Sequence, residues 1–288
     1  MKTVIIGDSC GDLPLDFIQE HQIPMVPYIF NFKEKDYLDD FGQSMPYKDF
    51  YDAVRKGEMP TTSQTNVHSI TGFFRKYAGQ NNTVIYLSFS SALSNTYNNA
   101  VMARDIVLKE YPSSDITVID TRSASLGEGL LVYYAVKMLE QGMSKEEIVN
   151  WVEANKLKVN HWFTVEDLGH LKRGGRVSGA AAFIGTVLNI KPILHVNDQG
   201  SLIPIEKVRG RKKSIKVLAD MLVENIVDPE KQVIAISHGD APDDALYLKE
   251  LVLEKVKVKD IIVNYIGPVI GAHSGPGTLA IFFLGEKR

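Results

Sequence analysis

The chain has 288 residues, of which 44% are hydrophobic and 23% charged, and this composition is typical of globular proteins rather than disordered, collagen-like or membrane-spanning ones. Its formal net charge of -3 gives no general support for binding to nucleic acid or anionic lipid. A single cysteine, Cys10, excludes an internal disulfide framework, and the apolar run Val4–Ile6 is too short for the core of a signal peptide, so we expect a cytoplasmic protein.

Short β-branched runs alternate with longer amphipathic segments along the chain. The short runs predict strands at Thr3–Ile6, Thr83–Leu87, Ile116–Ile119, Val233–Ile236 and Ile261–Tyr265. The longer segments predict helices at Pro14–Glu20, Tyr97–Tyr111, Leu126–Gln141, Lys145–Asn155, Lys212–Ile226 and Asp243–Val256. Ser144 and Glu147 have the spacing of a capping box, and Asp12 is a candidate N-cap. The alternation predicts an α/β fold with ligand groups at the carboxyl ends of strands.

The character of the sequence changes near residue 160. Beyond it, the segment Lys172–Gly185 is rich in small residues, and Lys191–Leu202 predicts a β-hairpin that turns around Asn197–Gly200. We therefore predict two α/β domains, residues 1–160 and 161–288. The first is expected to hold a mostly parallel sheet with flanking helices.

A run of hydroxyl side chains follows Pro60. Thr61, Thr62 and Ser63 each offer an O–H donor beside backbone N–H groups, which suits an anion or a carboxylate. The same residues could instead form a turn that caps a helix starting near Val67. The sequence alone leaves both interpretations open.

A second hydroxyl-rich segment, Ser88–Thr96, leaves a predicted strand and enters a predicted helix. Hydroxyls at a helix N-terminus meet unpaired N–H groups and the positive end of the helix dipole, which together favour anions. Ser94 is flanked by Leu93 and Asn95, so the segment is not the G-x-S-x-G turn of a hydrolase nucleophile. Ordinary helix capping is the alternative.

A single histidine, His273, lies within the glycine-rich segment Gly267–Gly277. The segment holds four glycines and two prolines, which indicates a tightly specified backbone that something can approach closely. A lone histidine is more often structural, but the flanking glycines favour a functional role here.

Two segments concentrate positive charge. Lys172–Arg176 holds three basic residues, and Glu206–Lys216 holds six basic residues against one acid. Such segments could bind phosphate or an acidic partner, or could simply form a solvated helix face. Near the first strand, Asp8 and Ser9 could serve a nucleotide or a metal, although a helix cap is the simpler interpretation.

Several common motifs are absent from the sequence. It contains no P-loop, no dinucleotide-binding glycine fingerprint and no H-E-x-x-H, and none of the seven histidines lies at zinc-ligand spacing from another. We therefore expect no metal site, no cofactor and no nucleic-acid partner. A serine with a distant histidine could still be the nucleophile and base of a hydrolase.

Taken in order, these segments resemble the DegV family, the bacterial fatty-acid-binding proteins that present an acyl chain to a dihydroxyacetone-kinase-like fatty acid kinase. The ordered set is specific and spans nearly the whole chain. Its matching pieces are Asp8-Ser9, Thr61–Gln64, Ser90–Tyr97, Asp167–Ser178, Lys191–Ile193 and Gly267–His273.

The resemblance implies a two-domain α/β fold that encloses one long-chain fatty acid in a tunnel between and within the domains. It implies that Thr62, Ser94 and His273 bind the carboxylate, with Ser63 and Ser91 as neighbours.

The resemblance also implies a partner. Arg173, Arg176 and Arg209 would lie on the side that meets the kinase, and ATP and metal would belong to that kinase. The small-residue stretch Ser178–Gly185, with Val187, Leu188 and Ile190 nearby, could line the tunnel or pack between helices.

Three functions follow as hypotheses. The leading one is a non-catalytic acyl carrier that holds a long-chain fatty acid and exposes its carboxylate to the kinase, without stable insertion into a membrane. The second is a serine-dependent esterase or acyltransferase that uses Ser94 and His273. The third is a sensor or scaffold that binds lipid and contacts a protein through the basic segments.

Overall fold

The computed structural model describes residues 2–80, 82–177 and 189–288. It is a mixed α/β structure with three sheets, which confirms the predicted fold class. The small-residue stretch Ser178–Gly185, together with Val187 and Leu188, lies outside the described residues.

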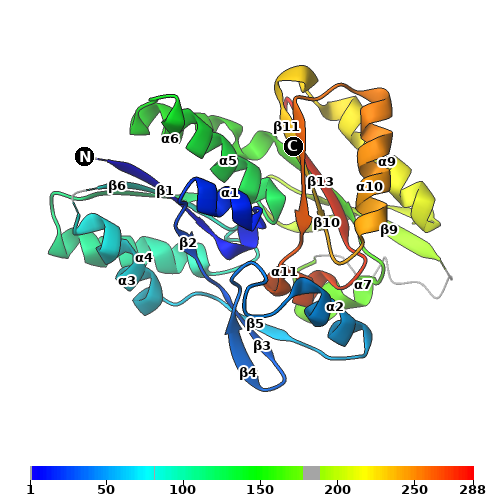
Figure 1. The fold of residues 1–288 in the computed structure, drawn as a ribbon, viewed down its shortest axis with the longest axis horizontal. Coiled ribbons are helices and arrows are strands. Elements are labelled where there is room, and N and C mark those ends of the chain that lie inside the picture. The colour runs from blue at the N-terminus through cyan, green and yellow to red at the C-terminus, as the bar shows by residue number, and fades with distance from the viewer. Residues whose placement is uncertain (1, 81, 178–188) are drawn as a thin grey trace.

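The first sheet is parallel, with the strand order β2-β1-β6-β7. It confirms the three strands predicted before residue 120. One face packs on α3 and α4, the other on α5, and α6 lies against α5 (Figure 1). The bounds of these elements are β1 Thr3–Asp8, β2 Met25–Val26, β6 Thr83–Ser88, β7 Asp115–Asp120, α3 Val67–Ala78, α4 Thr96–Glu110, α5 Leu126–Glu140 and α6 Lys145–Asn155.

Alternation along β1 explains why both faces are covered. Ile5 belongs to the core shared with α5, whereas its neighbour Ile6 packs with the core under α3 and α4. A strand buried on both faces reads as a continuous apolar run, which is why these strands were predictable. The predicted capping box of α6 is also present, because Ser144 and Glu147 exchange hydrogen bonds.

The second sheet is mixed, with the strand order β10-β9-β8-β13-β11-β12. Among the described strands of this sheet, only β11 and β12 pair in parallel, and the predicted hairpin is confirmed as the antiparallel pair β9–β10. The outer face carries α9 and α10 (Figure 1). The bounds are β8 Val159–Thr164, β9 Ile190–Val196, β10 Leu202–Arg209, β11 Val233–His238, β12 Asp260–Tyr265, β13 Leu279–Leu284, α9 Arg211–Asn225 and α10 Pro242–Lys255.

Side chains of β13 alternate between the two faces of this sheet. Ile281 and Phe283 pack in the core with α9 and α10, whereas Ala280 and Phe282 face the first sheet and its helices. The strand β8 begins at Val159, so the predicted domain boundary falls inside it. The division into domains 1–160 and 161–288 stays a prediction.

A third, antiparallel sheet of order β4-β3-β5 extends from the body of the protein as an arm, seen at the bottom of Figure 1. Its core contains Phe30, Phe50 and Tyr51, and the Tyr51 hydroxyl donates to the Ile266 carbonyl just before α11. The elements of this region are α1 Leu15–Glu20, β3 Ile29–Phe32, β4 Lys35–Leu38, α2 Tyr47–Arg55, β5 Thr61–Ser63, α7 Leu168–Gly174 and α11 Pro268–Ser274.

Two predicted caps are wrong. Asp12 does not cap α1, which begins after Pro14; it is buried and accepts hydrogen bonds from Ser125 and from the Gly267 N–H. The Thr61–Ser63 hydroxyls do not cap α3, because they lie in β5 and Asn66 caps that helix. By contrast, Asp8 does cap a short 3-10 helix at Ser9–Gly11, as the simpler interpretation predicted.

Candidate functional site

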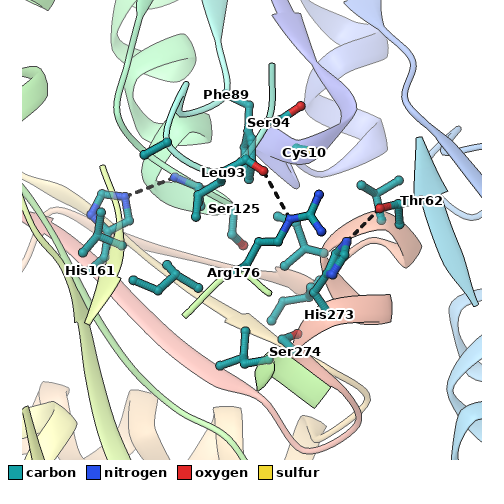
Figure 2. Close-up of a pocket in the computed structure, with 18 of the residues that line it drawn as sticks. Cys10, Thr62, Phe89, Leu93, Ser94, Ser125, His161, Arg176, His273 and Ser274 are labelled. Carbon is teal, nitrogen blue, oxygen red and sulfur yellow. Dashed lines mark hydrogen bonds between the residues drawn. The ribbon is translucent and has the colours of Figure 1, made fainter. Parts of the chain in front are cut away.

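A cavity of about 600 Å³ lies between the inner face of the second sheet and the loops at the carboxyl ends of β1, β6 and β7. This volume is in the range of small-molecule sites. The loops contribute Cys10, Phe89 and Ala124 to the wall (Figure 2). The sheet contributes a mostly apolar floor that includes Phe163, Val196, Leu202, Ala280 and Phe282.

Thr62 and His273 meet at one part of the cavity wall (Figure 2). Thr62 lies on β5 and His273 on α11, and the Thr62 Oγ1 is 2.7 Å from the His273 Nε2. Burial, with a smaller effect from the charge of Arg176, lowers the pKa of His273 to about 4. The imidazole is therefore neutral near pH 7.

The low pKa of His273 predicts a pH-dependent stability. An unfolded histidine has a pKa near 6.5, so between pH 6.5 and 4 the unfolded chain takes up a proton that the folded chain resists, and the free energy of unfolding falls as the pH falls. His273→Gln should remove this contribution, which amounts to about 3 kcal/mol at most. Urea denaturation should therefore give a difference in the free energy of unfolding between the two proteins that is constant above pH 7. As the pH falls to 4, the variant should become more stable relative to the parent protein. A difference that does not change with pH would contradict the assignment.

Gly174 lets α7 approach His273. A Cβ built on Gly174 would meet the His273 Nδ1 closer than unbonded atoms can approach. The next residue, Gly175, has a φ of 67° and ends the helix, and a Cβ there meets nothing within 4 Å.

These two glycines provide a matched pair of variants. Gly174→Ala should displace the His273 ring, break its hydrogen bond to Thr62 and weaken binding of an anionic ligand by about tenfold. Gly175→Ala should lower the free energy of unfolding by about 1 kcal/mol through its left-handed backbone and leave the ring in place. Ligand titration and denaturation of both variants test this. If both variants lost the same amount of affinity, the close contact between Gly174 and His273 would have no specific role in binding.

The predicted serines also line the cavity, but their hydrogen bonds differ. The Ser94 Oγ lies 3.0 Å from the Thr96 Oγ1. The Ser91 hydroxyl donates to Asp120 at 2.6 Å, so it also holds its own loop. Ser63 lies on β5 and is exposed. The structure thus brings Thr62, Ser63, Ser91, Ser94 and His273 to one cavity, and their role in binding stays a prediction.

The three predicted partner-binding arginines do not lie alike. Arg173 on α7 and Arg209 at the end of β10 are exposed. Arg176 is also exposed but lines the cavity, where its Nη1 donates to the Gly174 carbonyl at 2.6 Å and its Nε to the Leu93 carbonyl at 3.4 Å. It reaches this place because the turn at Gly175 sends the chain back from α7.

Other residues that line the cavity were not predicted from the sequence, and His161 is one of them. His161 on β8 is buried; its Nδ1 donates to the Val159 carbonyl at 2.9 Å, and its Nε2 accepts from the Ala124 N–H at 3.4 Å (Figure 2). Burial lowers its pKa well below the usual range. Alternation along β8 could have placed this side chain on the same face as Phe163, had the strand been predicted.

The geometry gives little support to a serine hydrolase. No hydrogen bond joins Ser94 to His273 among the described residues, where His273 bonds Thr62 instead. No carboxylate of the described chain orients His273 through a hydrogen bond. Over the same residues there is no group of three or more His, Cys, Asp or Glu that could hold a metal ion, and no helix is both long and apolar enough to cross a bilayer.

Comparison with known proteins gives consistent matches over the whole chain. The family model described as "Uncharacterised protein, DegV family" matches residues 2–286. A DegV domain-containing protein of Clostridium perfringens is 48% identical, covering 100% of this chain and 99% of its own. Protein DegV of Bacillus subtilis is 32% identical, with 98% of each chain covered.

Solved structures match equally well. A DegV family protein from Thermus thermophilus, described by its fatty acid binding, superposes with a TM-score of 0.88 at 31% identity, covering 99% of this chain and 100% of its own. DegV of Bacillus subtilis, described as a fatty acid binding protein, gives a TM-score of 0.85 at 31% identity, with the same coverage.

Proposed function

The chain belongs to the DegV family, and on this premise we propose that it binds a long-chain fatty acid in the cavity and presents the carboxylate to a partner fatty acid kinase. The observation that carries the proposal is the combination of an apolar sheet floor with the Thr62–His273 pair in the wall of one cavity. Relatives of the same fold from Thermus thermophilus and Bacillus subtilis are described as binding fatty acids, which supports the ligand class.

The acyl chain supplies most of the binding free energy in this proposal. Burying about fourteen methylenes at about 0.8 kcal/mol each gives a gross gain on the order of 11 kcal/mol, before the cost of ordering the chain. The polar groups of the wall then mainly orient the ligand. Thr62 and Ser94 would donate to the carboxylate, neutral His273 would hold Thr62 in place, and the nearby charge of Arg176 would favour the anion.

The proposed carrier has no catalytic role and no cofactor of its own. The kinase would bring ATP and metal and transfer a phosphoryl group to a carboxylate oxygen, and the carrier would retain the acyl phosphate for phospholipid synthesis in the cytoplasm. Arg173, Arg176 and Arg209 are all exposed, and they are the side chains that we propose for contact with the kinase; Arg176 also lines the cavity.

Two measurements test the proposal. Mass spectrometry of an organic extract of the purified protein should find a long-chain fatty acid, and delipidated protein should take one up with a stoichiometry near one. Finding no acid, with none taken up, would refute binding.

Phosphorylation by a purified fatty acid kinase with ATP tests presentation. Arg173→Glu with Arg209→Glu should abolish acyl-phosphate formation and leave fatty-acid binding unchanged, because both side chains lie outside the cavity lining. Thr62→Val, Ser94→Ala and His273→Asn should each reduce acyl-phosphate formation, because each removes a group proposed to bind or orient the carboxylate. Unchanged acyl-phosphate formation by all of these variants would remove the site assignment.

A further inference from the structure

The cavity wall holds a second set of hydroxyl groups that binding of a plain fatty acid does not use. Ser274, Ser237 and Ser125 all line the cavity, and each is buried. They come from three different elements: Ser274 ends α11, Ser237 lies on β11, and Ser125 precedes α5. They are distinct from the Thr62, Ser94 and His273 set proposed for the carboxylate.

Ser274 provides the strongest evidence among the three serines. It is only 4% exposed, and its Oγ makes no hydrogen bond to any described residue. A buried hydroxyl without a partner is destabilising, because it has lost its hydrogen bonds to water, so proteins rarely retain one without a reason. Because Ser274 lines the cavity, a bound ligand is the available partner for its O–H.

Ser125 and Ser237 form a chain of hydrogen bonds that ends at the same cavity. The Ser125 Oγ lies 2.5 Å from the Asp12 Oδ2 and 2.9 Å from the Ser237 Oγ. The other oxygen of Asp12 accepts from the Gly267 N–H at 2.8 Å. Within the described chain, Ser125 is the only hydrogen-bond partner of the Ser237 hydroxyl.

Asp12 sets the direction of this chain. Its carboxyl oxygen accepts a hydrogen bond from the Ser125 hydroxyl, so the Ser237 hydroxyl donates in turn to the Ser125 oxygen. No described residue donates to the side-chain oxygen of Ser237, which is therefore free to accept a hydrogen bond at the cavity wall.

The surroundings make these hydroxyls selective. The floor beside them is apolar, since Ser237 pairs across the sheet with Ala280, and Ala280 with Phe163. Figure 2 shows the labelled Ser125 and Ser274 among the residues that line the cavity. A methylene placed against Ser274 and Ser237 satisfies neither hydroxyl, whereas a hydroxyl on the acyl chain can accept from Ser274 and donate to Ser237.

We propose that Ser274 and Ser237 form a subsite for a hydroxyl group carried by the acyl chain, so that the preferred ligand is a hydroxy fatty acid rather than the unsubstituted acid. The inference rests on the proposed function, because it assumes that a fatty acid occupies the cavity. It adds a chemical class of ligand to that function.

The test measures displacement of a fluorescent fatty acid by stearic acid and by hydroxystearic and oxostearic acids substituted at successive carbons. At least one positional isomer of hydroxystearic acid should bind roughly threefold to tenfold more tightly than stearic acid, the effect of one net hydrogen bond. Ser274→Ala should erase the preference and leave the affinity for stearic acid unchanged or higher, since it removes an unpartnered hydroxyl. Ser237→Ala should reduce the preference.

A matched control is Ser214→Ala, a fully buried serine on α9 that does not line the cavity, which should keep the preference. If stearic acid binds but every substituted acid binds equally or more weakly, the subsite is refuted and the proposed function stands. A preference that persists in both Ser274→Ala and Ser237→Ala also refutes it. If none of the acids binds, the proposed function itself fails.

Discussion

Ala280→Phe is expected to reduce fatty-acid affinity by on the order of a hundredfold while the protein stays folded. Ala280 is 5% exposed, lies near the start of β13 and forms part of the cavity floor. A phenyl ring there would project into the space of the acyl chain and displace about four methylenes, or about 3 kcal/mol of apolar burial. The ring fills a cavity rather than a packed core, so it has room without distorting the sheet.

The measurement is a titration of delipidated protein with a long-chain fatty acid, combined with thermal unfolding. Ala280→Val is the graded control, because it adds less volume at the same place and should weaken binding by a smaller factor. Both variants should unfold at or above the temperature of the unliganded parent protein. Undiminished affinity in Ala280→Phe would mean that the acyl chain lies elsewhere.

Arg288→Ala is expected to lower the free energy of unfolding by about 3 kcal/mol or more. The Arg288 guanidinium makes five hydrogen bonds, and all of its acceptors are uncharged oxygens: the carbonyls of Val159, Arg122, Asn197 and Lys156, and the Ser123 Oγ. Hydrogen bonds to a charged group contribute about 1.5 to 3 kcal/mol each, less where water can replace the donor. Burial lowers the pKa of Arg288 to about 10, so it stays charged at neutral pH.

These bonds join segments that are far apart in the sequence. Arg288 ties the loop after β7 to the β9–β10 turn and to the start of β8. Urea denaturation of Arg288→Ala and Arg288→Lys tests its contribution, with the lysine variant expected to lose less because it keeps a charge and part of the donors. A loss below about 0.5 kcal/mol in Arg288→Ala would show that water replaces the guanidinium.

Local pattern was enough to predict much of the fold. The strands β1, β6, β7 and β11 each contain a short run of apolar and β-branched residues, and the capping box of α6 needs only Ser144 and Glu147, so neither depends on distant residues. The third sheet was not predicted, because β5 has only three residues and pairs with a strand far from it in the sequence. Asp12 was misassigned for the same reason, since its partners Ser125 and Gly267 are set by tertiary structure.

The candidate site was also predictable only in part. The runs of hydroxyl residues and the glycine-flanked histidine indicated groups that suit a carboxylate. The family resemblance then joined Thr62, Ser94 and His273 into one set. The place of Arg176 in the cavity wall could not be predicted, because it depends on the left-handed conformation of Gly175 and on the position of the Leu93 carbonyl. Likewise, His161 faces the cavity only because β8 pairs with β13 in a particular register.

Side chains along β13 point alternately to the two faces of the sheet, so adjacent residues serve different purposes. Ala280 and Phe282 shape the chamber, while Ile281 and Phe283 are packed beneath the outer helices. Substitutions of Ala280 or Phe282 can therefore change which ligands fit the cavity without destabilising the core under the outer helices. Related proteins could thus differ in ligand preference through single substitutions at these positions while keeping the same fold.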